Sequence, residues 1–143
     1  MKKNKHLLPI LGESVLQKAE IIYKQNGYFT DTILQELHSV YSTSLEQALD
    51  ILDKTKVIQY YARDSKRTLY LIGKGDKQLR LFEDINFCFC ETFRKDVLES
   101  GDKIMCEHVL GVKLAKITKG FVKEEMSDLY FVESLKIMSE TLC

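Results

Sequence analysis

Apolar residues recur at helical spacing over most of the first 54 residues, and this pattern predicts three helices. The first begins near Pro9, a residue that suits the first turn of a helix, and ends at Asn26-Gly27. The second begins at Thr30 or Asp31, and the third opens on Thr43-x-x-Glu46, which has the form of a capping box. The apolar positions are Val15, Leu16, Ala19, Ile22 and Tyr23 in the first helix, Ile33, Leu34, Leu37 and Val40 in the second, and Leu45, Ala48, Leu49 and Leu52 in the third.

The hydrophobic period changes after residue 54. β-Branched and aromatic residues dominate 57–61 and 68–72, and a third apolar segment covers 79–82. Turn-forming residues separate these segments, at Asp64-Ser65 and over Gly73–Asp76. The pattern predicts a small antiparallel β-meander, with a fourth strand over 85–87.

Helical spacing returns in the last third of the chain. One helix is expected over 109–117, and another from Leu129 to Met138 with Ser127 as its N-cap. Because helices and strands are segregated along the chain, the sequence predicts an α+β fold. We expect an N-terminal helical region over 1–54, followed over 55–143 by the meander and the C-terminal helices, in one compact unit.

Composition adds mainly exclusions. The chain has 143 residues, of which 29% are charged and 45% hydrophobic, so a disordered tail, a collagen-like repeat and a coiled-coil rod are not expected. No apolar run approaches the ~20 residues that a membrane helix needs. The basic start is followed by an apolar stretch, Leu7–Leu11, that is too short for a signal peptide. We therefore expect an intracellular protein that does not bind membranes.

The formal net charge of zero hides a basic segment over 54–80. Two interpretations remain open: a solvated hairpin whose lysines protect the sheet edge, or a surface on which Arg63, Lys66 and Arg67 contact a phosphate backbone. Four further lysines would share one helical face if the last-but-one helix continued past Gly120. Tyr60, Tyr61 and Tyr70 are either stacking platforms for bases or cross-strand core pairs. The basic residues of the segment are Lys54, Lys56, Arg63, Lys66, Arg67, Lys74, Lys77 and Arg80, and the four further lysines are Lys113, Lys116, Lys119 and Lys123.

The cysteines give the sharpest signal. Cys88 and Cys90 form a Cys-x-Cys pair, Cys106 and His108 form a Cys-x-His pair, and 15 residues separate the two pairs. On an extended segment, residues two apart point to the same side, so both sulfurs of the first pair face one way. Residues two apart on a helix point to different faces. Cys106 should therefore precede the helix and His108 should lie in its first turn, where the helix dipole stabilises a thiolate.

Three thiolates and one imidazole form a closed tetrahedral set for a single structural zinc ion, because a catalytic zinc usually keeps one position open for water. Two alternatives remain: three buried thiols beside a core histidine, and a disulfide, for which residues two apart are poorly placed. The remaining cysteine, Cys143, has no expected role. His38 is interpreted as a packed or surface residue.

Cys88-Phe89-Cys90 and Cys106-Glu107-His108 together resemble the SWIM-type zinc finger, whose pattern is Cys-x-Cys, a variable gap and Cys-x-His. The flanking elements make the resemblance more specific. A helix and a short meander precede the finger, and an apolar helix follows His108. This arrangement resembles the small SWIM subunits of the Shu complex, an accessory factor in homologous recombination. The resemblance implies an α+β fold in which a zinc knuckle joins the meander to the C-terminal helices.

The resemblance also implies a function. The chain would be a non-enzymatic nuclear subunit of a hetero-oligomer with a recombinase paralogue of the RecA family. That pair would promote DNA repair by assembling recombinase filaments on single-stranded DNA, which it would contact through the complex. In agreement, the sequence has no Gly-x-x-x-x-Gly-Lys-Ser/Thr motif, so any nucleotide would belong to the partner.

Two other functions remain open. Three helices followed by a hairpin also describe a winged helix, which would make the chain a direct nucleic-acid-binding regulator. Its recognition helix would be 44–54, whose exposed polar residues include Glu46, Asp50 and Asp53, the wrong sign for a phosphate surface. A thiol redox switch is a third possibility, although no resolving cysteine stands out.

Overall fold

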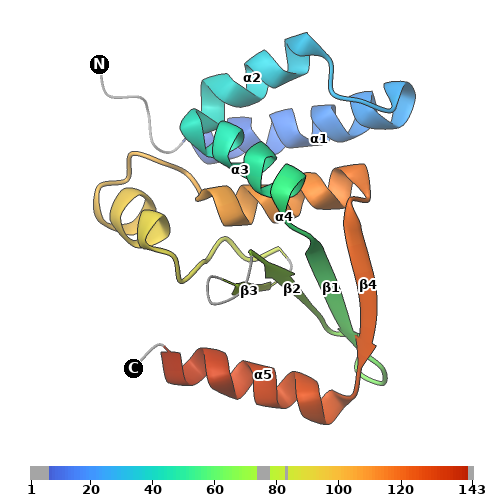
Figure 1. Ribbon diagram of the computed structural model, residues 1–143. Helices are drawn as coiled ribbons and strands as arrows, with labels where there is room; N and C mark the ends of the chain where they lie inside the picture. Colours follow the sequence, from blue (N-terminus) through green and yellow to red (C-terminus); the bar gives the residue numbers. More distant parts are fainter. Residues whose placement is uncertain (1–6, 74–77, 83, 142–143) are drawn as a thin grey trace.

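The computed structural model describes residues 7–73, 78–82 and 84–141 (Figure 1). Most of the expected turn over Gly73–Asp76, with Lys74 and Lys77 of the basic segment, lies outside the described residues, as does Cys143. Among the helices in the described ranges, none has the length and apolar character that crossing a membrane requires. The fold is α+β, as expected from the segregation of helices and strands.

The three N-terminal helices are confirmed as α1 (Leu8–Asn26), α2 (Asp31–Tyr41) and α3 (Thr43–Lys54). Gly27 ends α1 in the left-handed region, with φ 78°, and the Thr30 side chain caps α2 by accepting the Ile33 N–H at 3.3 Å. The expected capping box of α3 is wrong. No side-chain hydrogen bond caps that helix, and the carboxylate of Glu46 instead contacts the exposed ring of His38 at 2.8 Å.

The strands in the described part of the chain form one sheet, in the order β3-β2-β1-β4. The expected first three strands are present as β1 (Val57–Ala62), β2 (Thr68–Ile72) and β3 (Leu79–Phe82), joined by antiparallel pairing. The expectation of a fully antiparallel meander is wrong. Residues 85–87 form no strand, and the fourth strand is β4 (Phe121–Met126), which pairs parallel to β1.

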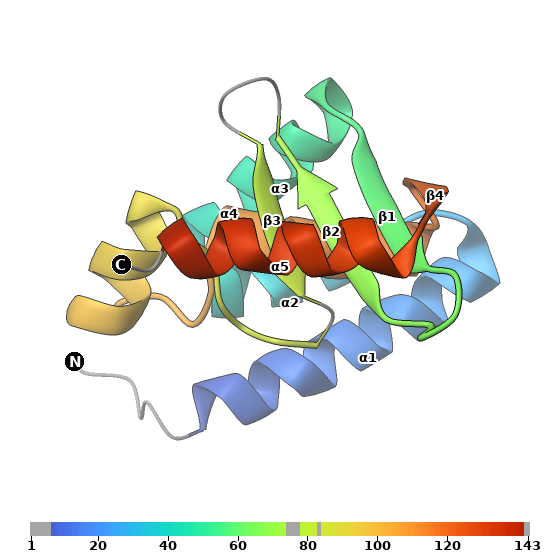
Figure 2. The same cartoon turned by 90° about the horizontal axis from the view of Figure 1, so that it is seen from below.

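The expected C-terminal helices are α4 (Glu107–Thr118) and α5 (Asp128–Thr141), which begins just after its N-cap Ser127. Helix α4 lies between the N-terminal helices and the sheet, and α5 lies on the opposite face of the sheet (Figures 1 and 2). Because α4 is enclosed on both sides, its apolar residues are not confined to one stripe. At Gly111 an added Cβ would lie 3.1 Å from Ile72 of β2, so the helix and the sheet approach closely there.

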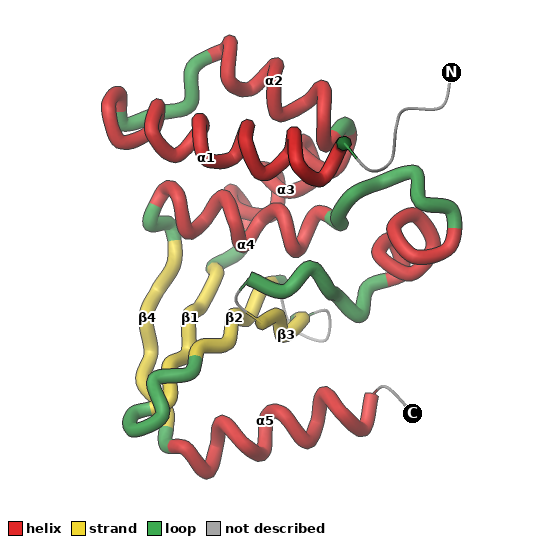
Figure 3. Tube along the Cα trace, turned by 180° about the vertical axis from the view of Figure 1, so that it is seen from behind, coloured by secondary structure: helices red, strands yellow, loops and turns green. Residues whose placement is uncertain are grey.

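A short π-helical segment over Phe93–Glu99 (η2), not expected from the sequence, fills the gap between the two Cys-containing pairs. It lies near the N-terminal end of α4 (Figure 3). The main hydrophobic core joins residues of the N-terminal helices, the sheet, η2 and α4, and both Cys88 and Cys106 belong to it. The candidate ligands therefore lie inside the core and not on a loop at its edge.

Candidate metal centre

The structure brings the four predicted ligands together. Each residue contributes one potential ligand atom, and these four atoms lie within 4.8 Å of one another; the residues are Cys88, Cys90, Cys106 and His108. Cys88 and Cys106 are buried, while Cys90 and His108 are half-buried. The three cysteines are free thiols, so the disulfide alternative finds no support in the described residues.

The first pair lies on the segment without regular secondary structure that leads from the sheet into η2. The ring of Phe87 packs against Phe89 and Phe93, with centroid distances of 5.0 and 5.4 Å, which fixes the segment against the core. The side-chain amide of Asn86 donates to the carbonyl of Ile104 at 2.9 Å. This bond ties the arm that carries Cys88 and Cys90 to the arm that leads to Cys106.

The second pair has the expected placement. Cys106 has an extended backbone, with φ −82° and ψ 172°, and precedes α4, while His108 lies in the first turn of that helix. The buried hydroxyl of Ser44 in α3 donates to the carbonyl of Met105 at 3.2 Å. The change from extended to helical backbone at Cys106 is what lets residues two apart face the same point.

The proximity of three sulfurs perturbs their acidity. Hydrogen bonds with Cys106 and Cys90, and then burial, raise the pKa of Cys88 far above its usual value. Hydrogen bonds with Cys106 and Cys88 lower the pKa of Cys90, whose sulfur also accepts the Phe93 N–H at 3.3 Å. Only a nearby cation would favour three thiolates at this spacing, because like charges in a buried site oppose each other.

The donor set fits a metal ion of the zinc class. The Nδ1 atom of His108 is buried and has no hydrogen-bond partner among the described residues, and neither does the adjacent Oε2 of Glu107. Buried polar atoms are rarely left unpaired in folded proteins, so an unpaired nitrogen on the histidine ring that joins this cluster indicates a missing partner. Thiolate sulfur and imidazole nitrogen are the ligands that zinc prefers, and the cluster could hold such an ion.

The three residues expected to contact nucleic acid lie near the β1–β2 turn, but two of them have intramolecular partners. The guanidinium of Arg63 forms an ion pair with Glu125 of β4 at 3.2 Å. The guanidinium of Arg67 lies 5.4 Å from the ring centroid of Phe131 in α5. Lys66 is exposed in the turn, with φ 62°. Phosphate binding here would have to compete with these contacts.

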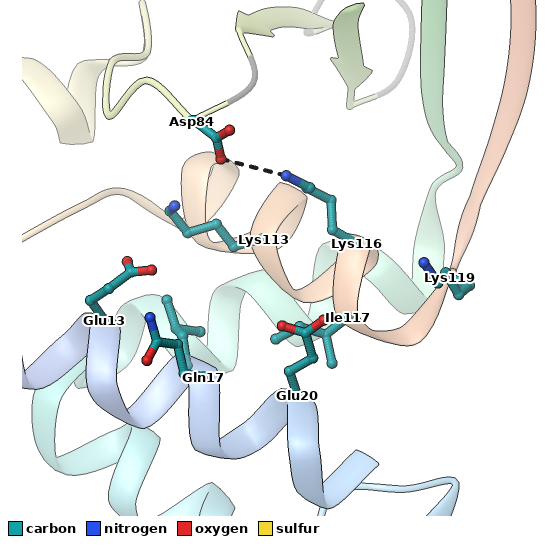
Figure 4. A pocket seen from close by; sticks show the side chains of 9 residues that line it. Glu13, Gln17, Glu20, Asp84, Lys113, Lys116, Ile117 and Lys119 are labelled. Atoms are coloured by element: carbon teal, nitrogen blue, oxygen red, sulfur yellow. Dashed lines mark ion pairs between the residues drawn. The ribbon is translucent and has the colours of Figure 1, made fainter. Parts of the chain in front are cut away.

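The expected face of four lysines is wrong. Helix α4 ends at Thr118, Lys119 follows with φ 60°, and Lys123 belongs to β4. The other three lysines of the set line a cleft of about 300 Å³ between α1 and α4 (Figure 4). Acidic side chains line the same cleft, and one of them, Asp84, forms an ion pair with Lys116 at 3.5 Å. Its charged residues are Lys113, Lys116, Lys119, Glu13, Glu20 and Asp84, so positive and negative charges balance and the cleft is no anion site.

The aromatic candidates divide. Tyr70 is buried, packs edge-to-face on Phe121 at 6.2 Å and accepts a hydrogen bond from Gln59 at 2.6 Å, so it is a core residue. Tyr60 and Tyr61 are half-buried on opposite faces of β1. Tyr60 lines a groove together with Tyr130 of α5, so it faces the side of the sheet that carries α5.

The chain is similar over most of its length to curated proteins described as zinc finger SWIM domain-containing protein 7. The human protein is 24% identical over 129 residues, which cover 90% of this chain and 92% of the human protein. The mouse protein is 24% identical over 128 residues, covering 90% of this chain and 84% of its own length, and the zebrafish protein is 25% identical over 118 residues, covering 82% and 84%. No family model matches the chain. No solved structure matches it. The relatives confirm the resemblance to SWIM-type zinc finger proteins.

Proposed function

Because the chain is a homologue of SWIM domain-containing proteins along nearly its whole length, we propose that it is a non-enzymatic subunit of a recombinase-paralogue complex. The complex promotes assembly of recombinase filaments on single-stranded DNA during homologous recombination repair. The partner is a RecA-family, ATPase-like protein, the assembly is a hetero-oligomer, and it acts in the nucleus. Contact with DNA is made through the complex.

The observation that carries the proposal is the Cys3His cluster inside the core. Its four ligands come from two arms of the chain, and one arm opens the central helix α4. A single structural zinc ion at this point fixes how α4 and the sheet lie relative to each other, and thus the shape of any partner surface built on them. Structural zinc contributes roughly 10–16 kcal/mol of apparent binding free energy, comparable to the whole stability of a typical domain.

The geometry of the cluster also supports a non-enzymatic role. A closed set of four protein ligands leaves no position at which zinc could activate water or polarise a substrate. The metal therefore supplies rigidity and not Lewis-acid chemistry. Any nucleotide hydrolysis in the complex belongs to the partner, whose fold provides the phosphate-binding loop.

Affinity purification from cells that contain the natural partners tests the proposal. Tagged wild-type chain should enrich a RecA-family paralogue, as measured by quantitative mass spectrometry. Cys106→Ser should lose that enrichment, whereas Cys143→Ser, a cysteine outside the ligand set, should keep it. Absence of any RecA-family protein with the wild-type chain, or an undiminished yield with Cys106→Ser, would contradict the proposal.

Direct DNA binding by this chain alone is the second candidate, and the exposed Lys66 is the observation in its favour. Binding of fluorescent single-stranded DNA, measured across salt concentrations, separates it from the first. Under the adaptor proposal, neutralising Arg63, Lys66 and Arg67 leaves the salt dependence of the complex unchanged. A smaller salt slope after neutralisation would instead assign phosphate contacts to this turn.

A further inference from the structure

The strand register defines a row of side chains on the face of the sheet that carries α5. Ile58 of β1 is paired with Leu71 of β2 on one side and with Val122 of β4 on the other, and Leu71 is paired with Arg80 of β3. Paired residues in neighbouring strands point to the same face. The row Arg80-Leu71-Ile58-Val122 therefore crosses the whole sheet, and we call it the open row.

Helix α5 covers only the other part of this face. Its Phe131 is buried against Ala62 and Leu69, in a small cluster separate from the main core. The apolar members of the open row are not in that cluster, and Val122 is 44% exposed. Figure 2 shows α5 crossing the strands and leaving the beginning of β1 and the end of β2 uncovered beyond it. Within the described part of the chain, the apolar members of this row are thus only partly covered, with Ile58 and Leu71 half-buried and Val122 exposed.

A groove of about 300 Å³ lies where α5 meets the uncovered part of the sheet. The Tyr130 side chain lines this groove and is 66% exposed, whereas its neighbour on the same helix, Phe131, is buried. Tyrosine and arginine are the residue types that most often anchor protein interfaces, and both occur here. The lining residues are Tyr60, Leu69, Leu71, Arg80, Met126, Tyr130 and Ser134.

Two charged residues of opposite sign come from the two edge strands of the sheet. Arg80 lies on β3, and Glu124 lies on β4, where it accepts a hydrogen bond from Tyr60. Among the described residues, neither has an ion-pair partner. Glu124 is paired with Tyr60 and so lies one row away from Arg80, and both Arg80 and Glu124 act on the Tyr60 hydroxyl.

We propose that an amphipathic helix of the partner protein lies beside α5 across this sheet face. Its apolar side covers Ile58, Leu71 and Val122, and an acidic residue of the helix pairs with Arg80. This helix completes the helical layer that α5 begins, which is the usual way in which a sheet face is buried. Single-stranded DNA fits less well, because Arg80 is the one basic residue among the described residues that line the groove, and a single cation offers no track for phosphates.

The inference rests on the proposed function for the identity of the partner, so its test uses the RecA-family paralogue that purifies with the wild-type chain. Arg80→Glu and Val122→Glu should each weaken the purified pair at least about tenfold, as measured by biolayer interferometry. Ile21→Glu is the matched control, because Ile21 is 57% exposed on the outer face of α1. It should leave the affinity within about threefold, the range of a peripheral change. Circular dichroism and zinc content confirm that each variant is folded.

Reversing the acidic residue of the partner helix to lysine should restore binding to Arg80→Glu. If the wild-type pair forms and both variants bind as tightly as wild type, the inference is overturned while the proposed function stands. If the wild-type chain binds no paralogue, both fail together. Self-association of the chain that Arg80→Glu abolishes would assign the face to a second copy, and loss of oligothymidylate binding in that variant would assign it to nucleic acid; either result overturns the partner helix.

Discussion

The bond between Ser44 and Met105 should be a main support of the metal centre. Ser44 is fully buried in α3, and its hydroxyl donates to the carbonyl of Met105, the residue immediately before the ligand Cys106. The two residues are 61 positions apart in the chain, so this bond joins an N-terminal helix to the arm that carries the second ligand pair. Ser44→Ala removes the donor and leaves the carbonyl of the buried Met105 without it.

The size of the effect follows from that burial. A buried acceptor left without its partner costs about 1–3 kcal/mol, whereas a solvated one costs little. For a chain of this length, 1 kcal/mol lowers the melting temperature by roughly 2–4 °C, so Ser44→Ala should melt about 2–12 °C below the wild type. Zinc should stay bound, because its apparent binding free energy of roughly 10–16 kcal/mol exceeds the loss.

Differential scanning calorimetry of zinc-loaded protein measures this shift. The matched control is Ser39→Ala, which removes an exposed hydroxyl that donates to the carbonyl of Glu36 in α2. Because water can replace that bond, the control should melt within about 2 °C of the wild type. Equal melting temperatures for the two variants would refute the reasoning, since burial would then make no difference.

Three further predictions follow from described contacts. Wild-type protein should contain one zinc ion per chain by inductively coupled plasma mass spectrometry; Cys88→Ser and His108→Ala should lose it and yield less soluble protein, whereas Cys143→Ser should do neither. Gly12→Ala places a methyl group 2.6 Å from the Tyr41 hydroxyl oxygen and should destabilise the fold by about 1–3 kcal/mol in urea titrations, and adding Tyr41→Phe should recover part of that loss; strictly additive effects would contradict the contact. Burial, and then a nearby carboxylate, raise the pKa of Tyr41 above 10.0, so stability should hold below pH 10 and fall as pH rises beyond it, less steeply in Tyr41→Phe; identical pH profiles would contradict this.

Local sequence patterns were sufficient to predict the helices and strands that are specified by their own residues. Helices α1 to α3 have a continuous apolar face, and β1 to β3 have β-branched or aromatic runs between turn residues. The ligand set was predictable for a related reason: two residues two apart converge only on extended backbone or at a helix start, and Cys106 at the start of α4 meets that condition. Chemistry and local geometry indicated the same four side chains.

The remaining elements depend on contacts distant in the sequence. Strand β4 has an exposed, charged middle in Lys123, Glu124 and Glu125, so it lacks the apolar alternation that predicts a strand, and only its parallel ladder with β1 defines it. Helix α4 ends because Lys119 takes a left-handed backbone, which its residue type does not favour. The π-helix η2 has no sequence period of its own and is held by Phe93 in the core.

The parallel pairing of β1 with β4 has a kinetic consequence. Ile58 and Val122 are paired although roughly 60 residues separate them, and such distant contacts form slowly because the chain must first close a long loop. If zinc first joined the two ligand arms, the loop that must close between β1 and β4 would be shorter by about a third. This would lower the entropic cost of closing the loop by only about 0.4 kcal/mol, which is too little to make the β1–β4 pairing form early. During synthesis the free edge of β1 should therefore stay exposed until the whole of β4 has left the ribosome, and the nascent chain is most prone to aggregate in that interval.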